Sequence, residues 1–368
     1  MRTSKPKILV VIARLNVGGT AQYIEKLVNG LNSNGFDAVI ATGYVQGSER
    51  EDPRVSGLPI MRIPSLGRKI SPIRDLKAWL ELRKTVKTFQ PDLIYSHTFK
   101  AGLLVRTIFT STRRVHAFHG HLLSEPELSG WKRRAVILIE RWLAPRAEVL
   151  VTVGERVARE LLDECVGNAS QYKSIAPGVE HLELSDRKQV LADFQIETEL
   201  PIVVWLARVT AVKAPHRVVE LAKRIPEAFF VMAGGGDLLP SMKSLELENF
   251  RVLGWQDANQ MWAIADVALS TSENEGMPVA LIEAQLSGLP VVAIDVGSVC
   301  EVVEDGSTGY VVKEFGEEYV AKLKLLISDR FLRESMGKAA RERAEKEFSP
   351  SQMIKTHIDL FTKLLKLD

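Results

Sequence analysis

The sequence predicts an α/β protein of two domains, each built on an open parallel sheet. Three observations support this prediction. The length of 368 residues exceeds one ordinary core, β-branched runs alternate with amphipathic segments, and this alternation stops and restarts once near the middle. Strands that alternate with helices form βαβ units and hence parallel sheets. Ligands of such sheets bind at the carboxyl ends of the strands.

The first half of the chain predicts one such domain. The expected strands are 7–13, 37–42, 59–63, 93–96, 115–118 and 149–153, and the expected helices are 20–32, 72–88, 131–143 and 155–165. The tripeptide Ala176-Pro177-Gly178 breaks the alternation, and a polar stretch over 180–199 follows it. We therefore expect the first domain to cover 1–178 and the linker to lie in the polar stretch.

The second half restarts the same alternation. The expected strands are 201–206, 228–233, 250–253, 267–270 and 291–294, and the expected helices are 214–224, 238–245, 258–265, 279–286 and 299–303. After the run Gly309-Tyr310-Val311-Val312 the chain is expected to be helical, through 317–326, 330–346 and 351–367. The second domain should then cover 179–350. With two domains facing each other, the cleft between them is the expected site.

Composition and charge limit the functional classes. Apolar residues make up 46% and charged residues 26%, as in ordinary globular proteins. Lys and Arg number 27 against 18 Asp and Glu over 1–185, but 21 against 28 over 186–368. A basic half beside an acidic half indicates either an anionic partner of the first half or two domains that attract each other. Nucleic acid is not expected, because no basic–aromatic motif accompanies the charge.

The cysteines and the apolar runs indicate a compartment. Cys165 and Cys300 cannot form a disulfide framework and lack metal-ligand spacing, which favours a reducing cytoplasm. The N-terminus reads as strand rather than signal peptide. Apolar runs stay below the length of a membrane-spanning helix. We expect a cytoplasmic protein that at most rests on the inner face of the plasma membrane.

The most specific segment runs from Ser272 to Ala284. Glu275 and Glu283 lie eight residues apart, with a strand-to-helix turn at Gly276 between them. A helix N-terminus offers backbone N–H groups and a positive dipole end to phosphate oxygens, and a carboxylate nearby accepts ribose hydroxyls. The alternative interpretation is a solvated acidic loop with a Glu near a helix start.

This segment resembles glycosyltransferase family four, the retaining transferases of the GT-B fold. The family's E-x7-E signature followed by Ala matches Glu275, Glu283 and Ala284, and its Gly-x-Pro-Val strand matches 288–292. The resemblance implies that Glu283 binds the ribose hydroxyls and Glu275 the donor sugar, with Gly276 and Met277 presenting backbone N–H groups. Pro278 replaces a frequent Gly and removes one N–H.

A second match opens the second domain, where Arg208 follows the strand 201–206 and Lys213 comes five residues later. Physically, two cations stabilise the charge that develops on a leaving diphosphate. The resemblance assigns them that role, although Ala207 and Ala214 stand where the family has Gly. The sequence contains no Asp-x-Asp motif, so we expect neither a metal nor another cofactor. Without the other motifs, a solvated surface pair is the usual interpretation.

Glycines and the helix start complete the expected donor site. Two glycines after the first strand let backbone approach a ligand, and they are not followed by the third glycine of a dinucleotide fingerprint. The resemblance places Gly19 on the acceptor side as well. The further residues that the resemblance assigns to donor binding are Gly18, Gly19, Gly235, Gly254 and Val279.

Histidines follow two strands of the first domain. The resemblance carries His119 over as the residue beside the reacting carbon, with His121 as the alternative. His97 ends the preceding strand and is a further candidate that faces the cleft. A lone histidine is more often structural.

The resemblance implies a metal-independent, retaining hexosyltransferase. It would move a hexose or N-acetylhexosamine from a nucleotide-diphosphate sugar, with UDP the expected nucleotide, to a glycan or lipid-linked acceptor of cell-envelope polysaccharide. Front-face attack is expected, because no carboxylate is placed as a nucleophile. The final helix, 351–368, is expected to cross back onto the first domain. Two alternatives stay open: a UDP-sugar 2-epimerase, and a non-catalytic relative that binds nucleotide sugar.

Two basic amphipathic stretches of the first domain, 68–87 and 131–146, mix cations with tryptophan and leucine. Such helices lie in the headgroup region of anionic bilayers, which would fit a lipid-linked acceptor. The alternative is a pair of ordinary crossover helices with polar faces.

Overall fold

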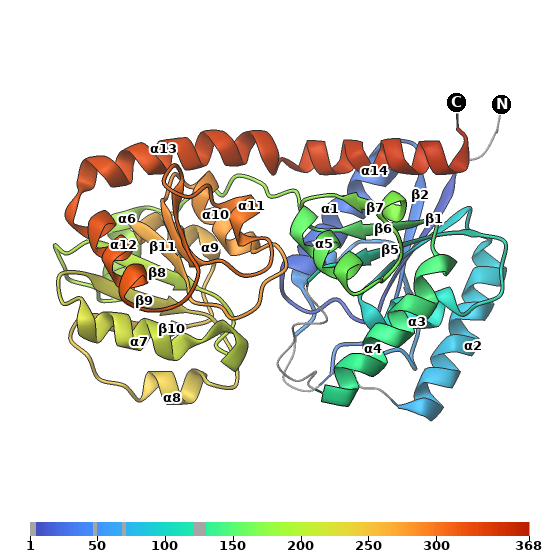
Figure 1. Ribbon diagram of the computed structural model, residues 1–368, viewed down its shortest axis with the longest axis horizontal. Helices are drawn as coiled ribbons and strands as arrows, with labels where there is room; N and C mark the ends of the chain where they lie inside the picture. The colour runs from blue at the N-terminus through green and yellow to red at the C-terminus, as the bar shows by residue number, and fades with distance from the viewer. Residues whose placement is uncertain (1–4, 47–49, 68–70, 121–129, 368) are drawn as a thin grey trace. The chain divides into compact units, whose positions relative to one another are not determined.

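A computed structural model of the protein describes residues 5–46, 50–67, 71–120 and 130–367. The chain divides into two compact units. The N-terminal unit comprises 1–178 and 350–368, and the C-terminal unit comprises 179–349 (Figure 1). Each unit contains one parallel sheet with helices on both faces, which confirms the predicted α/β class.

The sheet of the N-terminal unit has seven strands in the order β3-β2-β1-β4-β5-β6-β7. They are β1 (Lys7–Ile12), β2 (Asp37–Thr42), β3 (Ile60–Arg62), β4 (Leu93–His97), β5 (Arg113–Phe118), β6 (Val149–Thr152) and β7 (Tyr172–Ser174). All neighbouring pairs are parallel. The strand order reverses between β1 and β4, and such a switch point marks the ligand edge of an open sheet. In register, Ile12 pairs with His97 and His97 with Ala117, so His97 lies at this edge.

Helices bury both faces of this sheet. They are α1 (Gly19–Ser33), α2 (Pro72–Phe89), α3 (Phe99–Arg106), α4 (Gly130–Leu143), α5 (Glu155–Asp163) and α14 (Pro350–Leu365). Ile8 and Val10 of β1 pack with residues of α1 and α14, while Leu9 and Val11 pack with residues of α2 and α3. A strand that is covered on both sides needs a continuous apolar run, which explains the sequence of β1.

The C-terminal helix α14 belongs to the N-terminal unit by its packing. A Cβ atom on Gly30 of α1 would lie 2.6 Å from the Ile354 side chain, so glycine permits the close approach of the two helices. His357 and Phe361 of α14 are fully buried against Tyr95 of β4.

The C-terminal unit has six parallel strands in the order β10-β9-β8-β11-β12-β13. They are β8 (Ile202–Leu206), β9 (Phe229–Ala233), β10 (Phe250–Gly254), β11 (Val267–Ser270), β12 (Val291–Ile294) and β13 (Gly309–Val312). The helices are α6 (Arg187–Asp193), α7 (Pro215–Arg224), α8 (Leu239–Lys243), α9 (Ala258–Ile264), α10 (Val279–Leu286), α11 (Val299–Val302), α12 (Glu317–Ser328) and α13 (Arg330–Glu347). The switch point here lies between β8 and β11, which places the loops after these strands at the ligand edge.

Three elements differ from the expectation. The polar stretch 180–199 was expected to be a linker but contains α6, whose N-cap Asp186 accepts a hydrogen bond from the Gln189 N–H over 2.8 Å. Two further elements were not predicted. Helix α3 is short and contains Gly102, and β7 has only three residues at the sheet edge. Such short elements carry too little periodicity to be recognised in a sequence. Among the described residues, no helix is both long and apolar enough to cross a bilayer.

Candidate active site

The loops that follow β8, β9 and β10 are joined by backbone hydrogen bonds. The Val209 N–H donates to the Gly235 carbonyl over 2.9 Å, and the Gly234 N–H donates to the Gly254 carbonyl over 2.6 Å. Gly234 has φ +143°, and a Cβ atom there would lie 1.8 Å from the Ala207 carbonyl oxygen. Glycine is therefore required at 234 for loop packing. The predicted donor residues Gly235 and Gly254 thus lie in one rigid group of strand ends.

Arg208 and Lys213 follow β8, as expected, and differ in their surroundings. Arg208 is exposed, whereas Lys213 lies at the end of a short 3₁₀ turn and is largely covered. The Lys213 ammonium donates to Glu275 Oε1 over 2.6 Å, with side chains that are 15% and 12% exposed. The structure therefore brings together two of the predicted site residues, from loops 62 residues apart.

Thr271 holds these two loops together, although nothing in its sequence pattern indicates this role. Its hydroxyl donates to the Lys213 carbonyl over 2.9 Å and accepts from the Trp205 indole N–H over 3.0 Å. The Glu273 N–H also donates to the Val212 carbonyl over 2.9 Å. The position of Lys213 is thus fixed through its backbone by β11. A hydroxyl at a strand end is too common in sequences to indicate this role.

The Glu275 loop is pressed against a glycine of the next crossover. Gly297 has φ +51°, and a Cβ atom there would lie 1.8 Å from the Glu275 carbonyl oxygen. The Ser298 N–H donates to the Gly276 carbonyl over 2.8 Å. The backbone around Glu275 and Gly276 is therefore held by residues 297 and 298, and the Glu275 carboxylate is held by Lys213, which fixes the direction of the Glu275 side chain before any ligand binds.

Helix α10 begins directly after this loop, with Pro278 at its N-cap. Met277 and Pro278 are buried, and Val279 is half-buried. Glu283 lies one turn after Val279 and is 7% exposed. Side chains on a helix lean toward its N-terminus, so the Glu283 carboxylate leans toward the first turn of α10. The predicted sugar and ribose carboxylates thus lie on either side of one helix start.

The ligand edge of the N-terminal unit carries a pair of histidines. His97 Nδ1 and His119 Nε2 lie 2.7 Å apart, and the Tyr23 ring meets the His119 ring edge-on with centroids 4.8 Å apart. His97 is fully buried, so its predicted place facing a cleft is wrong: it supports His119 from beneath. His119 is half-buried. The alternative, His121, lies outside the described residues.

Both histidines are neutral at pH 7. Burial lowers the pKa of His97 well below its usual value, and the neighbouring His119 and His357 add to this effect. Burial also lowers the pKa of His119 to about 4, with a further contribution from His357. A neutral imidazole can donate or accept a hydrogen bond but carries no charge toward a ligand. His119 is therefore a hydrogen-bonding group here, and not a cation.

The loop before α1 carries the predicted glycines. Gly18 is the N-cap of α1, with φ +148°, and the space around its α-carbon is open. Burial acts to raise the pKa of Asp52, but hydrogen bonds from Arg54 and from the Gly18 backbone lower it overall. The Gly18 N–H thus has a protein acceptor in Asp52, which leaves Gly19 as the adjoining donor at the helix start. Asp52 lies 34 residues after Gly18 in the sequence, so sequence patterns alone do not indicate this contact.

Over the described ranges, no three His, Cys, Asp or Glu side chains lie close enough together to hold a metal ion.

Two family models match the chain in succession. The description "Glycosyl transferase 4-like domain" matches 18–178, and "Glycosyl transferases group 1" matches 186–343. The two matches correspond closely to the two units. They cover both the His119 edge and the Lys213–Glu275 loops.

Individual relatives are distant. The chain is 26% identical to the sulfoquinovosyl transferase SQD2 of Arabidopsis thaliana over 71% of this chain, and it spans about half, 54%, of that protein. It is 25% identical to the UDP-Gal:alpha-D-GlcNAc-diphosphoundecaprenol alpha-1,3-galactosyltransferase of Escherichia coli, over 68% of this chain and 70% of that one.

A solved structure shows the same fold over the whole length. The Anabaena protein HepE, in complex with UDP-glucose, superposes with a TM-score of 0.80 at 18% identity, covering 97% of this chain and 99% of that one. The successive family matches and this superposition lead to one conclusion: the chain belongs to glycosyltransferase family four and has the GT-B fold.

Proposed function

We propose that the protein is a retaining glycosyltransferase that moves a hexose or N-acetylhexosamine from a UDP-sugar to a glycan or lipid-linked acceptor in cell-envelope polysaccharide synthesis. The observation that carries the proposal is the Lys213–Glu275 pair, held rigidly at the strand ends beside the start of α10. The names of two relatives support the nucleotide: one uses UDP-Gal, and the other was solved with UDP-glucose.

In the proposed mechanism the pair separates when the donor binds. A diphosphate oxygen competes with Glu275 for the Lys213 ammonium, because phosphate carries more negative charge than one carboxylate. Once Lys213 turns to the diphosphate, Glu275 is released to accept hydroxyl groups of the sugar. Arg208 adds a second cation to the same diphosphate. Donor binding would therefore assemble the catalytic arrangement, and an empty site would keep its charges neutralised.

The proposed transfer retains the anomeric configuration. The glycosidic C–O bond to the diphosphate breaks, and the acceptor oxygen forms its bond on the same face of the sugar. The acceptor hydroxyl gives its proton to the departing phosphate oxygen, so no protein base is needed. His119, being neutral, would accept or donate a hydrogen bond at the sugar. Arg208 and Lys213 stabilise the developing phosphate charge in place of a metal.

The direct test is a transfer assay with EDTA present. Labelled UDP-glucose, UDP-galactose and UDP-GlcNAc would be supplied in turn with a lipid-diphosphate-linked N-acetylglucosamine, and label would be counted in the organic phase. We expect transfer from one donor, unchanged by EDTA. Conversion of the donor to its 2-epimer without acceptor would overturn the proposal. Loss of transfer in EDTA with recovery in Mn²⁺ would overturn its metal-free part.

Replacing Glu283 and replacing Glu275 should have different effects on UDP binding and on turnover. Glu283→Ala is expected to weaken UDP binding by about tenfold or more, because it removes a charged acceptor of the ribose hydroxyls. Glu275→Ala should leave UDP affinity equal or higher, since it removes the competitor for Lys213, while turnover falls. Calorimetry with UDP, together with transfer rates, measures both. Equal UDP affinity in wild type and Glu283→Ala would remove the ribose assignment.

We also propose the cytoplasm, at the inner face of the plasma membrane, as the place of reaction. Neither cysteine takes part in a disulfide, which fits a reducing compartment.

A further inference from the structure

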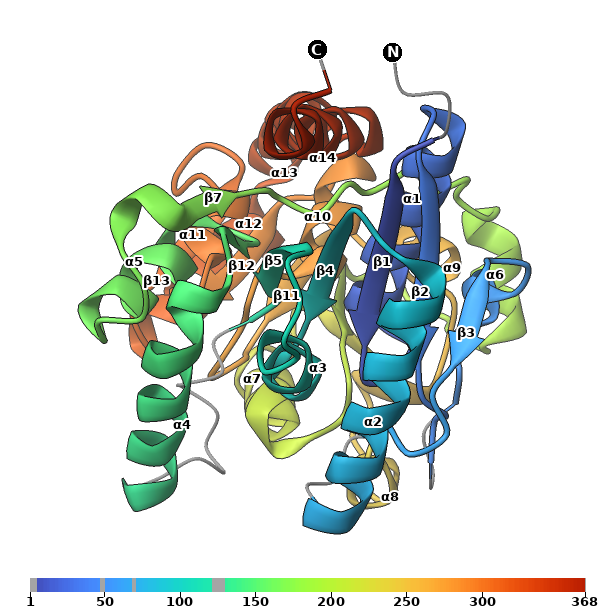
Figure 2. The same ribbon diagram turned by 90° about the vertical axis from the view of Figure 1, so that its right-hand side faces the viewer.

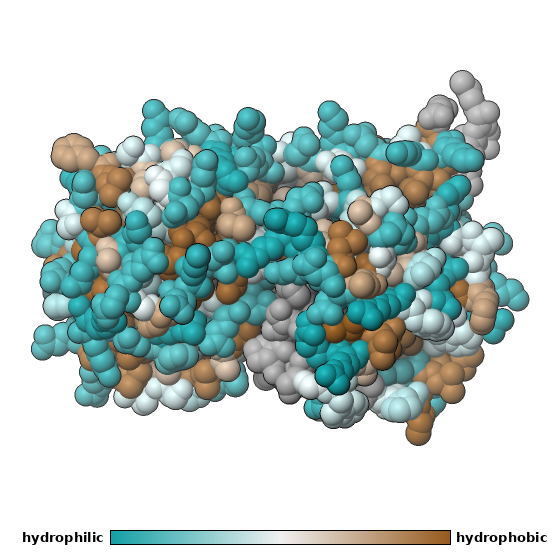
Figure 3. Space-filling model, in the orientation of Figure 1, coloured by the Kyte–Doolittle hydropathy of each residue, from teal (hydrophilic) through white to brown (hydrophobic). Residues whose placement is uncertain are grey.

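Two helices of the N-terminal unit, α2 and α4, expose large apolar side chains and lie on either side of α3 (Figure 2). Ile73, Leu76 and Leu80 of α2 are between 51% and 73% exposed, and Trp131, Leu138 and Trp142 of α4 are between 52% and 75% exposed. Scattered single exposures are ordinary, but a concentration on two helices of one layer indicates an interaction surface. We call these six side chains the α2–α4 face. In Figure 3 brown side chains stand among teal ones over these helices.

The helical period places each set on one side of its helix. The spacing of 73, 76 and 80 is that of one helical face, and so is the spacing of 131, 138 and 142. The inner faces are occupied by other residues. Ala78, Leu82 and Val86 of α2 pack with β1 and α3, so the exposed residues are a second apolar stripe that the fold itself does not use.

Cations share the exposed stripes. Lys77, Lys84 and Lys87 of α2 are exposed and fall on the face of Ile73 and Leu80. On α4, Arg134 and Arg141 are exposed within the same stripe as Leu138. Long cationic side chains can lay their apolar stems along a nonpolar surface and keep their charge in water.

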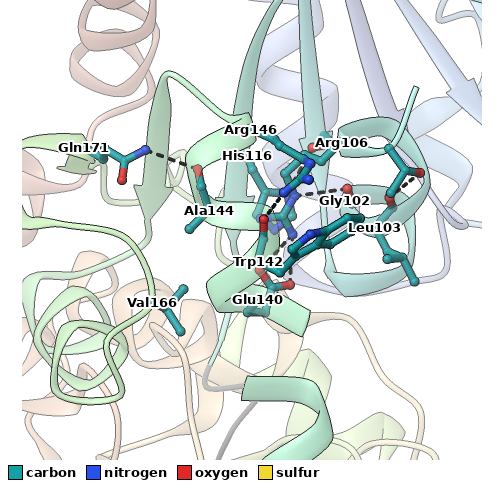
Figure 4. A network of polar contacts seen from close by, with 12 residues as sticks. Gly102, Leu103, Arg106, His116, Glu140, Trp142, Ala144, Arg146, Val166 and Gln171 are labelled. Carbon is teal, nitrogen blue, oxygen red and sulfur yellow. Dashed lines mark hydrogen bonds and ion pairs between the residues drawn. The ribbon is translucent and has the colours of Figure 1, made fainter. Parts of the chain in front are cut away.

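The acidic residues of α2 and α4 are paired with other groups of the N-terminal unit and do not belong to the exposed stripes. On α2, Asp75 pairs with Lys100 over 2.6 Å, and Glu81 accepts from the Ser65 backbone and hydroxyl. On α4, Glu140 is fully buried and accepts two hydrogen bonds, of 2.9 and 2.8 Å, from the Arg106 guanidinium (Figure 4). An unpaired buried carboxylate is costly, so Arg106 keeps Glu140 inward. Over the described residues of α2 and α4, the exposed charges beside the α2–α4 face are thus all positive.

The two helices also start at the same edge of the unit. Figures 1 and 2 both show α2, α3 and α4 side by side, with the first turns of α2 and α4 at the same lower end. Helices that follow parallel strands begin at the carboxyl edge of the sheet. Trp131 and Ile73 therefore lie toward the edge that carries His119.

From these observations we infer that the α2–α4 face docks on an anionic lipid bilayer. The apolar stripes enter the headgroup boundary, the tryptophan rings lie at its level, and the lysines and arginines contact lipid phosphates. A second copy in a symmetric contact is disfavoured, because it would bring the two positive faces together. The inference does not rest on sugar transfer, since docking is measured without substrate.

The test is co-sedimentation of the full-length protein with vesicles. Vesicles of phosphatidylcholine with 30% phosphatidylglycerol, on the order of the anionic lipid content that attracts basic segments, would be compared with pure phosphatidylcholine. We expect binding to the anionic vesicles that weakens with salt. Lys84→Glu with Lys87→Glu should weaken it by at least about 25-fold, since each cation contributes about fivefold.

The apolar part is tested by a triple variant with Trp131, Leu138 and Trp142 changed to alanine. Its binding to anionic vesicles should fall by about tenfold or more. Phe331→Ala is the matched control, because Phe331 is 84% exposed on α13 of the C-terminal unit and should leave vesicle binding unchanged. Circular dichroism checks that each variant is folded.

Three outcomes would overturn the inference. One is equal sedimentation of wild type and triple variant with anionic vesicles. The second is a protein that does not bind vesicles and forms a dimer in sedimentation velocity, which the triple variant dissociates; the face would then be a contact between copies. The third is a monomer that does not bind vesicles, which would indicate an acidic protein partner instead.

Discussion

Replacing Lys213 by alanine is expected to lower the rate of sugar transfer by about 100- to 1,000-fold. Removal of one preorganised group that stabilises transition-state charge typically costs this much. Lys213 is held through its backbone carbonyl by Thr271, so its side chain is at the donor site before the diphosphate charge develops. The variant also leaves Glu275 without its cation, next to a negatively charged donor. Both effects act on the same step.

Steady-state kinetics with the preferred UDP-sugar measures this effect. Lys223→Ala is the matched control, because Lys223 is an exposed lysine of α7 away from the strand ends, and its rate should equal that of wild type. Lys213→Arg should recover part of the loss, since it restores charge with a different shape. An unchanged kcat in Lys213→Ala would exclude Lys213 from the leaving-group site.

Acidification from pH 7.5 to pH 5.5 is expected to destabilise the N-terminal unit by several kcal/mol. His97, His116 and His357 are fully buried in it, and burial lowers the pKa of each below 6.5, for His357 to about 4. The unfolded chain therefore binds more protons than the folded one between pH 6.5 and pH 4, so stability falls as pH falls through this window. Burial also lowers the pKa of His119 to about 4, so this histidine adds to the same loss of stability.

Hydrogen exchange followed by mass spectrometry at both pH values tests this expectation. Peptides of β4, β5 and α14 should lose protection at pH 5.5 beyond the intrinsic pH effect on exchange, while β8, β9 and β11 should keep it. His116→Gln should lose less stability on acidification than wild type, because one buried titrating group is removed. His216→Gln is the control, because His216 is exposed in the C-terminal unit. Equal losses in both units would contradict the buried-histidine explanation.

Much of the site in the C-terminal unit could be predicted from local sequence patterns. Glu275, Gly276 and Glu283 lie within nine residues of one another, and the periodicity of β11 and α10 places them around one turn. The same holds for Arg208 and Lys213 after β8. Here the strand-to-helix alternation that predicts the fold also predicts where these side chains emerge.

Long-range contacts could not be predicted in this way. The hydrogen bond between Tyr23 and His357 joins residues 334 apart, and nothing in either segment signals the other. The burial of His97 beneath His119 depends on the register of β4 against β5, which a strand pattern does not determine. The contact of Asp52 with Gly18 and the pairing of Glu140 with Arg106 also join residues that lie far apart in the sequence. Neither could be predicted from local sequence patterns.

The central claim is that the C-terminal unit binds a nucleoside diphosphate through cations and carboxylates alone. Calorimetric titration in EDTA with UDP, GDP, ADP, UDP-glucose, UDP-GlcNAc and GDP-mannose tests it most directly. We predict that uridine ligands bind and that Arg208→Ala weakens this binding by about tenfold or more. Absence of binding across the whole panel would contradict the claim and indicate that the protein keeps the family's fold without its donor.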